Sequence, residues 1–165
     1  MKSKIISAFG AVTLGGCAMM APMPAPQAAW AQSTGQMKAS GGKTEIVGEI
    51  TIRSDAGNFL AEVSKGPGLP LLKIYAAGEH PNEVIVRGAL ARGGWKGHPL
   101  KAPEALQAWA VLPEVFHWAR AQAKRDGAFA FSIADVKRAG RRAGDKVVYL
   151  ELQRGVEKIV LHLDP

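Results

Sequence analysis

The chain contains only one cysteine, Cys17, which lies ahead of everything that reads as a folded domain. A later domain without a thiol has no disulfide, so its own apolar core must stabilise it. The same absence excludes a cysteine nucleophile, a cysteine-ligated zinc ion and a redox dithiol within that domain.

A long apolar run is also lacking. The uncharged stretch from Ile5 to Ala21 contains three glycines, and prolines follow from Pro22 onward. It lies at the short end of the ~20 residues that a membrane-spanning helix needs. Lys2 and Lys4 precede it, as in the basic start of a secretory signal. We therefore expect an export signal in residues 1–31 rather than a permanent transmembrane anchor.

Two processing sites remain open. The sequence Leu14-Gly15-Gly16-Cys17 resembles the lipobox of bacterial lipoproteins. This resemblance implies that Cys17 is lipidated and becomes the mature N-terminus. Since Ala18, not aspartate, follows it, the resemblance also implies an outer-membrane lipoprotein facing the periplasm. Alternatively, Ala29-Trp30-Ala31 is an A-x-A site, and cleavage after Ala31 would give a soluble periplasmic protein.

Composition divides the rest of the chain into two parts. Residues 18–43 are rich in Ala, Pro, Met, Gly, Ser and Gln and show no hydrophobic periodicity, which predicts a flexible linker. Residues 44–165 number about 120, near the commonest size of a single domain. We expect one globular domain there.

The hydrophobic pattern of this domain predicts an α+β fold. Alternation predicts strands at 45–53, 59–63, 71–76, 84–90, 147–152 and 159–163, and helical spacing predicts helices from Pro103, over 113–125 and over 132–144. In the third helix, Ser132 and Asp135 have the spacing of a capping box. The expectation is an antiparallel sheet of about five to six strands with two to three helices.

The last 40 residues, 126–165, are similar to the end of bacterial PDZ domains. The order Asp126-Gly127, Ser132 to Val136, Ala143 to Val147 and Leu150-x-Leu152-x-Arg154-Gly155 matches their last helix and two strands. The resemblance implies a PDZ-like fold and peptide binding as an alternative. The residues before Asp126 depart from the family, because they read as a helix where PDZ domains have a turn and a strand.

Basic residues exceed acidic ones, at 21 Lys and Arg against 14 Asp and Glu. In an envelope protein such a surface suits an envelope protein partner, peptidoglycan or anionic lipid. Lys137, Arg138, Arg141, Arg142 and Lys146 form the densest group, which is either an anion or membrane-surface contact or a solvated helix face. Aromatic residues do not alternate with them, so nucleic-acid binding is not expected.

Few other residues suggest chemistry. Trp95, among glycines, is either a ligand-stacking side chain or a cap over the core. The four histidines, His80, His98, His117 and His162, form no H-x-x-x-H pair. Glu114 and His117 have the i, i+3 spacing of some metal sites, but a single such pair is better explained as an exposed ion pair. We expect no metal and no cofactor.

These observations favour a non-catalytic binding or scaffolding module on the periplasmic side of the envelope. The alternatives are a hydrolase of envelope polymers and the PDZ-like peptide binder. A hydrolase would need a pocket that joins His98, Trp95 or His117 to distant acids, whereas a groove beside a strand edge would favour binding.

Overall fold

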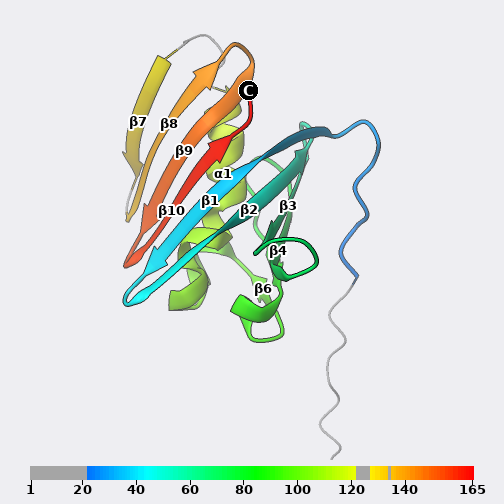
Figure 1. Ribbon diagram of the computed structural model, residues 1–165, viewed down its shortest axis with the longest axis vertical. Coiled ribbons are helices and arrows are strands. Elements are labelled where there is room, and N and C mark those ends of the chain that lie inside the picture. Colours follow the sequence, from blue (N-terminus) through cyan, green and yellow to red (C-terminus); the bar gives the residue numbers. More distant parts are fainter. Residues whose placement is uncertain (1–21, 122–126, 134) are drawn as a thin grey trace, which may run out of the picture.

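The computed structural model describes residues 22–121, 127–133 and 135–165. Its main element is one antiparallel sheet of ten strands in the order β6-β5-β4-β3-β2-β1-β10-β9-β8-β7 (Figure 1). The strands are β1 Ala31–Gly41, β2 Thr44–Ser54, β3 Asn58–Ser64, β4 Pro70–Ala77, β5 Val84–Arg87, β6 Trp95–Gly97, β7 Gly127–Ile133, β8 Val136–Ala143, β9 Lys146–Arg154 and β10 Glu157–Leu163. Between β6 and β7 the chain forms the helix α1, Gln107–Ala121. Three short 3-10 turns, η1 Ala89–Ala91, η2 Pro99–Lys101 and η3 Glu104–Leu106, precede it.

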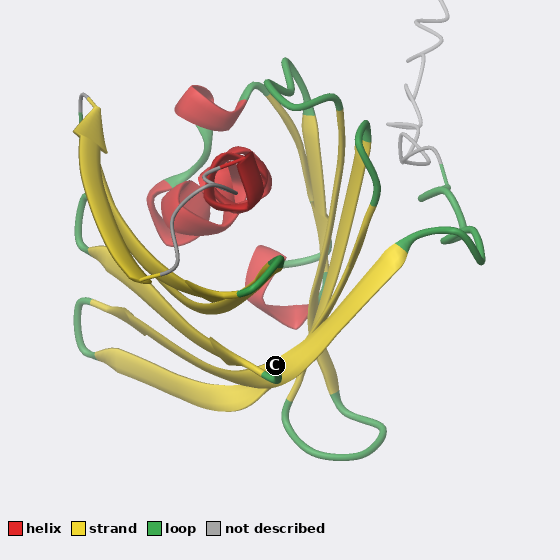
Figure 2. Cartoon of the chain, turned by 90° about the horizontal axis from the view of Figure 1, so that it is seen from above, coloured by secondary structure: helices red, strands yellow, loops and turns green. Residues whose placement is uncertain are grey.

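The sheet is strongly curved and wraps around α1 (Figure 2). Strand β1 lies in its middle, where it pairs with β2 on one side and with β10 on the other. It therefore joins the strands that precede α1 to those that follow it.

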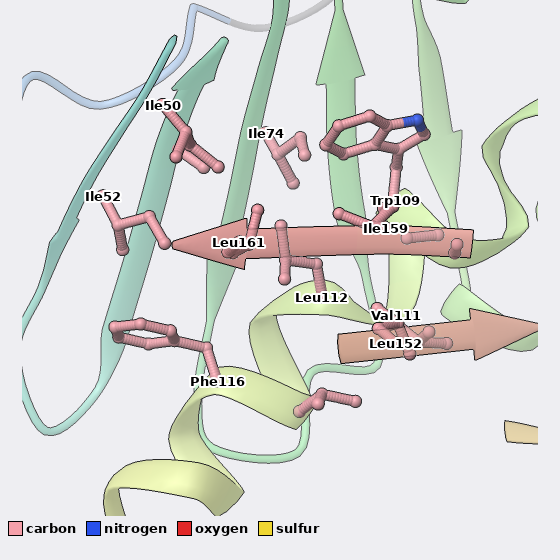
Figure 3. Close-up of a cluster of buried hydrophobic side chains, with 14 of the residues drawn as sticks. Ile50, Ile52, Ile74, Trp109, Val111, Leu112, Phe116, Leu152, Ile159 and Leu161 are labelled. Carbon is pink, nitrogen blue, oxygen red and sulfur yellow. The ribbon is translucent and has the colours of Figure 1, made fainter. Parts of the chain in front are cut away.

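The core lies between the concave face of the sheet and α1 (Figure 3). Alternation along β2 and β10 turns Ile52 and Leu161 inward, where Leu112 and Phe116 of the helix meet them. The helix is buried on most sides, which explains why it is apolar nearly all round. Full burial of one such side chain, for example Leu112, contributes about 1.5–3 kcal/mol.

The helix continues through Pro113, where the sequence suggests a new helical segment. Proline lacks an N–H group, so the carbonyl of Trp109 has no helical donor there. Such a residue costs about 3 kcal/mol in a helix interior. The buried side chains on both sides of Pro113 offset this cost, because they hold both halves of α1 against the same sheet.

The expected fold class is wrong. The described residues contain ten strands and a single α-helix, instead of five to six strands with two to three helices. The segment 132–144 was expected to be a helix, but of its described residues 132–133 end β7 and 136–143 form β8, which pairs with β7. Its side chains alternate with period two: Arg138 and Arg142 are buried while Lys137 and Arg141 are exposed. Because this hairpin replaces the expected helix, the PDZ-like fold is wrong as well.

The expected flexible linker, 18–43, is wrong in its second half. Residues 31–41 are strand β1, and Met37 and Ala39 are part of the core. Trp30, immediately before the strand, is also buried. The glycines, serines and glutamines of β1 hid it from pattern analysis, but hydrogen bonding to a strand on each side stabilises it. The domain therefore includes at least residues 30–43 in addition to 44–165.

Candidate ligand-binding pocket

The basic residues singled out by the sequence do not form one surface. Lys137 and Arg141 project from the convex face of β8, and Lys146 is exposed at the start of β9. Arg138 and Arg142 point into the concave side, where only 8% and 5% of their surface is exposed. A joint contact of all five with a membrane surface is incompatible with this arrangement.

Only two of the four histidines come together: His80 and His98 line one cavity, and His117 and His162 are not among its lining residues. His117 is buried beside Phe59, with 6.3 Å between the ring centroids, and burial lowers its pKa. Glu114 is close to His80 rather than to His117, with 3.6 Å between the carboxylate oxygen and Nδ1 of His80. His162 contacts Tyr149 on the convex face. Within residues 22–121, 127–133 and 135–165, no group of three His, Cys, Asp or Glu side chains is placed to hold a metal ion.

Trp95 packs against the core rather than standing free for a ligand. It lies in the short strand β6, is half-buried, and contacts the core cluster. A Cβ atom added at Gly97 would lie 3.0 Å from its indole ring. Gly97 therefore leaves the room that this ring occupies, and the interpretation as a cap over the core is the one that fits.

A cavity of about 350 Å³ lies at the end of the curved sheet where the β1–β2 and β9–β10 turns approach the start of α1. In Figure 1 these two turns are the lower tips of the cyan and orange–red strand pairs. Its wall is mostly apolar, with contributions from Ile46, Leu90, Trp109, Val156 and Ile159. We call this cavity the Trp109 pocket.

One side of the Trp109 pocket is acidic. Glu157 is buried, and its carboxylate accepts a hydrogen bond from the backbone N–H of Ala108 at 2.9 Å. Burial raises its pKa, although the backbone donors of Ala108 and Gln107 oppose that shift. A carboxylate is favourable here because the first turn of a helix carries partial positive charge. Glu104 lies beside it on the wall.

The residues that line the Trp109 pocket suit binding better than catalysis. Its hydroxyl groups belong to Ser40 and Thr44, and neither a histidine nor a cysteine is among the lining residues. A serine or threonine nucleophile needs a neighbouring base to remove its proton. Glu157 already serves as a cap for α1.

A second cavity, of about 250 Å³, does join one of the expected residues to acids. His98 lines it together with Glu114 and Asp135, while Trp95 and His117 lie elsewhere. Nδ1 of His98 accepts a hydrogen bond from the N–H of Leu100 at 3.2 Å. In the described residues His98 forms no ion pair with either acid, so no acid–histidine dyad is assembled there.

Neither the scan against models of protein families nor the search of curated proteins finds a match for this sequence. In the part of the chain that the structure describes, no helix has both the length and the apolar character needed to cross a membrane.

Sequence reasoning missed the Trp109 pocket entirely. The sequence gives Trp109 only a place in a predicted helix that begins at Pro103, and the segment of β1 that forms one wall lies in the predicted linker. The sequence does mark the two hairpin turns, through Gly42 and Gly155, which both have positive φ, but it does not show that the turns lie side by side.

Proposed function

We propose that this chain is a non-catalytic binding module of the cell envelope that takes the apolar part of a small amphiphile into the Trp109 pocket. The observation that carries this proposal is the pocket itself. Its volume lies within the ~300–1,000 Å³ typical of small-molecule sites, and such sites are mainly apolar with a few polar groups. Among the expected envelope partners, anionic lipid is the one that offers an apolar chain.

The location of the domain rests on the signal-like N-terminus, and the position of Trp30 bears on how that segment is cut. Cleavage after Ala31 would remove the buried Trp30 and the first residue of β1. Cleavage before Cys17 would keep both. It would leave residues 18–29 as a tether of at most about 43 Å between lipid and domain. This supports a lipid-anchored protein on the periplasmic side of the outer membrane.

Ligand binding is tested with dodecanoate, a simple single-chain amphiphile, by displacement of a bound fluorescent fatty acid. The variant Ala105→Trp places a large ring at an exposed residue of the pocket wall, so it fills the cavity without disturbing the core. We expect it to weaken dodecanoate binding by about tenfold or more, as a loss of ~1.4 kcal/mol would.

The matched control is Ala143→Trp, which adds the same ring at an exposed residue of β8 that does not line the pocket. Equal binding by both variants and the native chain would refute the pocket as the ligand site.

The anchor is tested separately by labelling cells with a fatty-acid analogue. We expect the native chain to be labelled and to partition with membranes, and Cys17→Ala to lose both properties. Labelling that persists in Cys17→Ala would contradict lipidation at this residue.

A further inference from the structure

We propose that the second cavity binds a small zwitterion, an α-amino acid with a short aliphatic side chain. We call it the Arg138 cavity. It does not depend on the Trp109 pocket, because its ligand chemistry and its walls are different. Four segments line it, and they lie at residues 80–82, 98–100, 111–115 and 135–138.

The two cavities lie against different faces of α1. An α-helix turns by about 100° per residue, so Glu114 projects about 140° away from Trp109. Val111 and Val115 share the Arg138 cavity with Glu114. The other walls come from opposite ends of the sheet: residues 80–82 follow β4, whereas 135–138 begin β8. The cavity thus occupies the gap in the curved sheet that α1 faces.

Arg138 supplies the positive end. Its guanidinium carbon lies 4.4 Å from the centre of the Trp118 ring, which fixes the plane of the group by a cation–π contact. With 8% of its surface exposed, this side chain has lost most of its water. Burial is the main reason why its pKa is lowered, and a desolvated guanidinium gains most from a carboxylate that it binds through two N–H groups.

Arg142 adds a second positive charge to the same side of β8. Only 5% of it is exposed, and neither Nε nor Nη1 has a hydrogen-bond partner among the described residues. A buried charge without compensation is costly. Together the two arginines give this side of α1 a positive potential that favours the anionic end of a ligand.

Glu114 supplies the negative end. Its charge opposes the lowering of the Arg138 pKa, so the two groups act on each other across the cavity. Its neighbour His80 is 85% exposed and at 3.6 Å makes only a weak contact, which carries charge only when His80 is protonated. The other acid, Asp135, already has a partner, because its Oδ2 lies 3.1 Å from Nε of Arg154. Glu114 is therefore the carboxylate available to a ligand ammonium group.

The remaining walls define the rest of the ligand. Since Nδ1 of His98 accepts the N–H of Leu100, the neutral ring carries its proton on Nε2 and can donate it. Asn82 adds an amide. Val111, Val115 and Val136 make an apolar floor that suits a methyl or isopropyl group. A simple anion would be repelled by the carboxylate of Glu114, and a simple cation by the guanidinium of Arg138. Only a ligand that carries both charges can pair with both groups.

The experiment is isothermal titration of the folded chain with L-alanine, D-alanine, L-valine and D-valine, and with acetate and ethylammonium as half-ligands. We expect at least one amino acid to bind, and both half-ligands to bind about tenfold or more weakly, because each lacks a charged hydrogen-bonding group. Arg138→Gln and Glu114→Gln should each weaken amino-acid binding by about the same factor.

Two controls separate this site from general effects. Lys137→Gln removes a charge from the adjacent, exposed residue of β8 and should leave binding unchanged. Trp109→Leu alters the other pocket and should also leave it unchanged. If Arg138→Gln does not fold, Glu114→Gln still decides, since Glu114 is partly exposed on the helix. The proposal would be overturned if none of the four amino acids binds at about 10 mM. It would also be overturned if acetate binds as tightly as the amino acids, or if Lys137→Gln weakens binding as much as Arg138→Gln does.

Discussion

Replacement of Arg154 by methionine should be among the most damaging single changes in the domain. Arg154 is 4% exposed and points from the end of β9 towards the segment before α1. Nη1 donates to the carbonyl oxygens of Pro99 at 2.8 Å and Gln107 at 3.3 Å, and Nη2 donates to that of Leu100 at 3.0 Å. Methionine keeps the apolar stem but removes every donor, so three carbonyl groups lose a charged donor at once. The carbonyl oxygen of Pro99 keeps the N–H of Ala102 at 3.3 Å, and that of Gln107 lies in the first turn of α1, where a helical N–H can bond to it.

The magnitude follows from these contacts. A hydrogen bond to a charged group contributes about 1.5–3 kcal/mol, and a buried acceptor left without one costs about 1–3 kcal/mol. Leu100 is exposed, so water replaces part of the loss there. The loss of the two charged hydrogen bonds to the less exposed carbonyls, those of Pro99 and Gln107, should lower the free energy of unfolding by about 3–5 kcal/mol. The ion pair with Asp135 accounts for less than about 1 kcal/mol of this, because Asp135 is largely exposed.

The assay is urea unfolding followed by circular dichroism, with the m-value compared between variants. Arg141→Met is the matched control, since it makes the same change at an exposed residue on the convex face of β8 and should cost under about 0.5 kcal/mol. Asp135→Asn isolates the ion pair. A loss below about 1 kcal/mol for Arg154→Met, or one equal to that of Arg141→Met, would refute the view that this guanidinium ties β9 to the start of α1.

Two further predictions concern buried or strained positions. Burial lowers the pKa of His117, so as pH falls below about 6.5 the unfolded chain binds a proton before the folded one does and the stability decreases. His117→Leu should flatten this decline in unfolding experiments between about pH 7 and pH 5, and an unchanged slope would contradict the assignment. Gly155 has φ +57°, and an added Cβ would lie 2.7 Å from Oε1 of Gln107, whereas Gly42 has the same φ with nothing within 4 Å. Gly42→Ala should cost about 1–2 kcal/mol from backbone strain, and Gly155→Ala about the same, because the close atom is the end of the flexible Gln107 side chain, which can turn aside. A clearly larger loss for Gly155→Ala would contradict this.

Sequence analysis found the strands in which large apolar residues alternate with more polar ones. In β2, Ile50 and Ile52 face the core while exposed or half-exposed residues lie between them, and β10 repeats the pattern with Ile159 and Leu161. The prediction failed for β1 because few of its residues are large and apolar. It failed for β8 because Arg138 and Arg142 point inward, whereas a hydrophobicity pattern assigns arginine residues to the surface.

The candidate pocket was beyond sequence analysis for a geometrical reason. Its walls come from residues 39–46, 90, 104–109 and 156–159, which only the pairing of β1 with β10 and the curvature of the sheet bring together. Neither the pairing nor the curvature can be predicted from the local hydrophobic periodicity of the sequence. The buried state of Arg138 was equally hidden, because its environment depends on which face of β8 turns towards Trp118.

The central position of β1 has a consequence for how the polypeptide reaches its native state. Gly35 pairs with Leu163, a separation of 163 − 35 = 128 residues. Strand β1 can therefore pair with β10 along its whole length only after residue 163 has been made. Pairings of such long range are slow to form, because the entropy of a large loop is lost before any contact repays it. During synthesis from the N-terminus, β1 therefore has only β2 as a partner until β10 has been made, and the sheet is completed late.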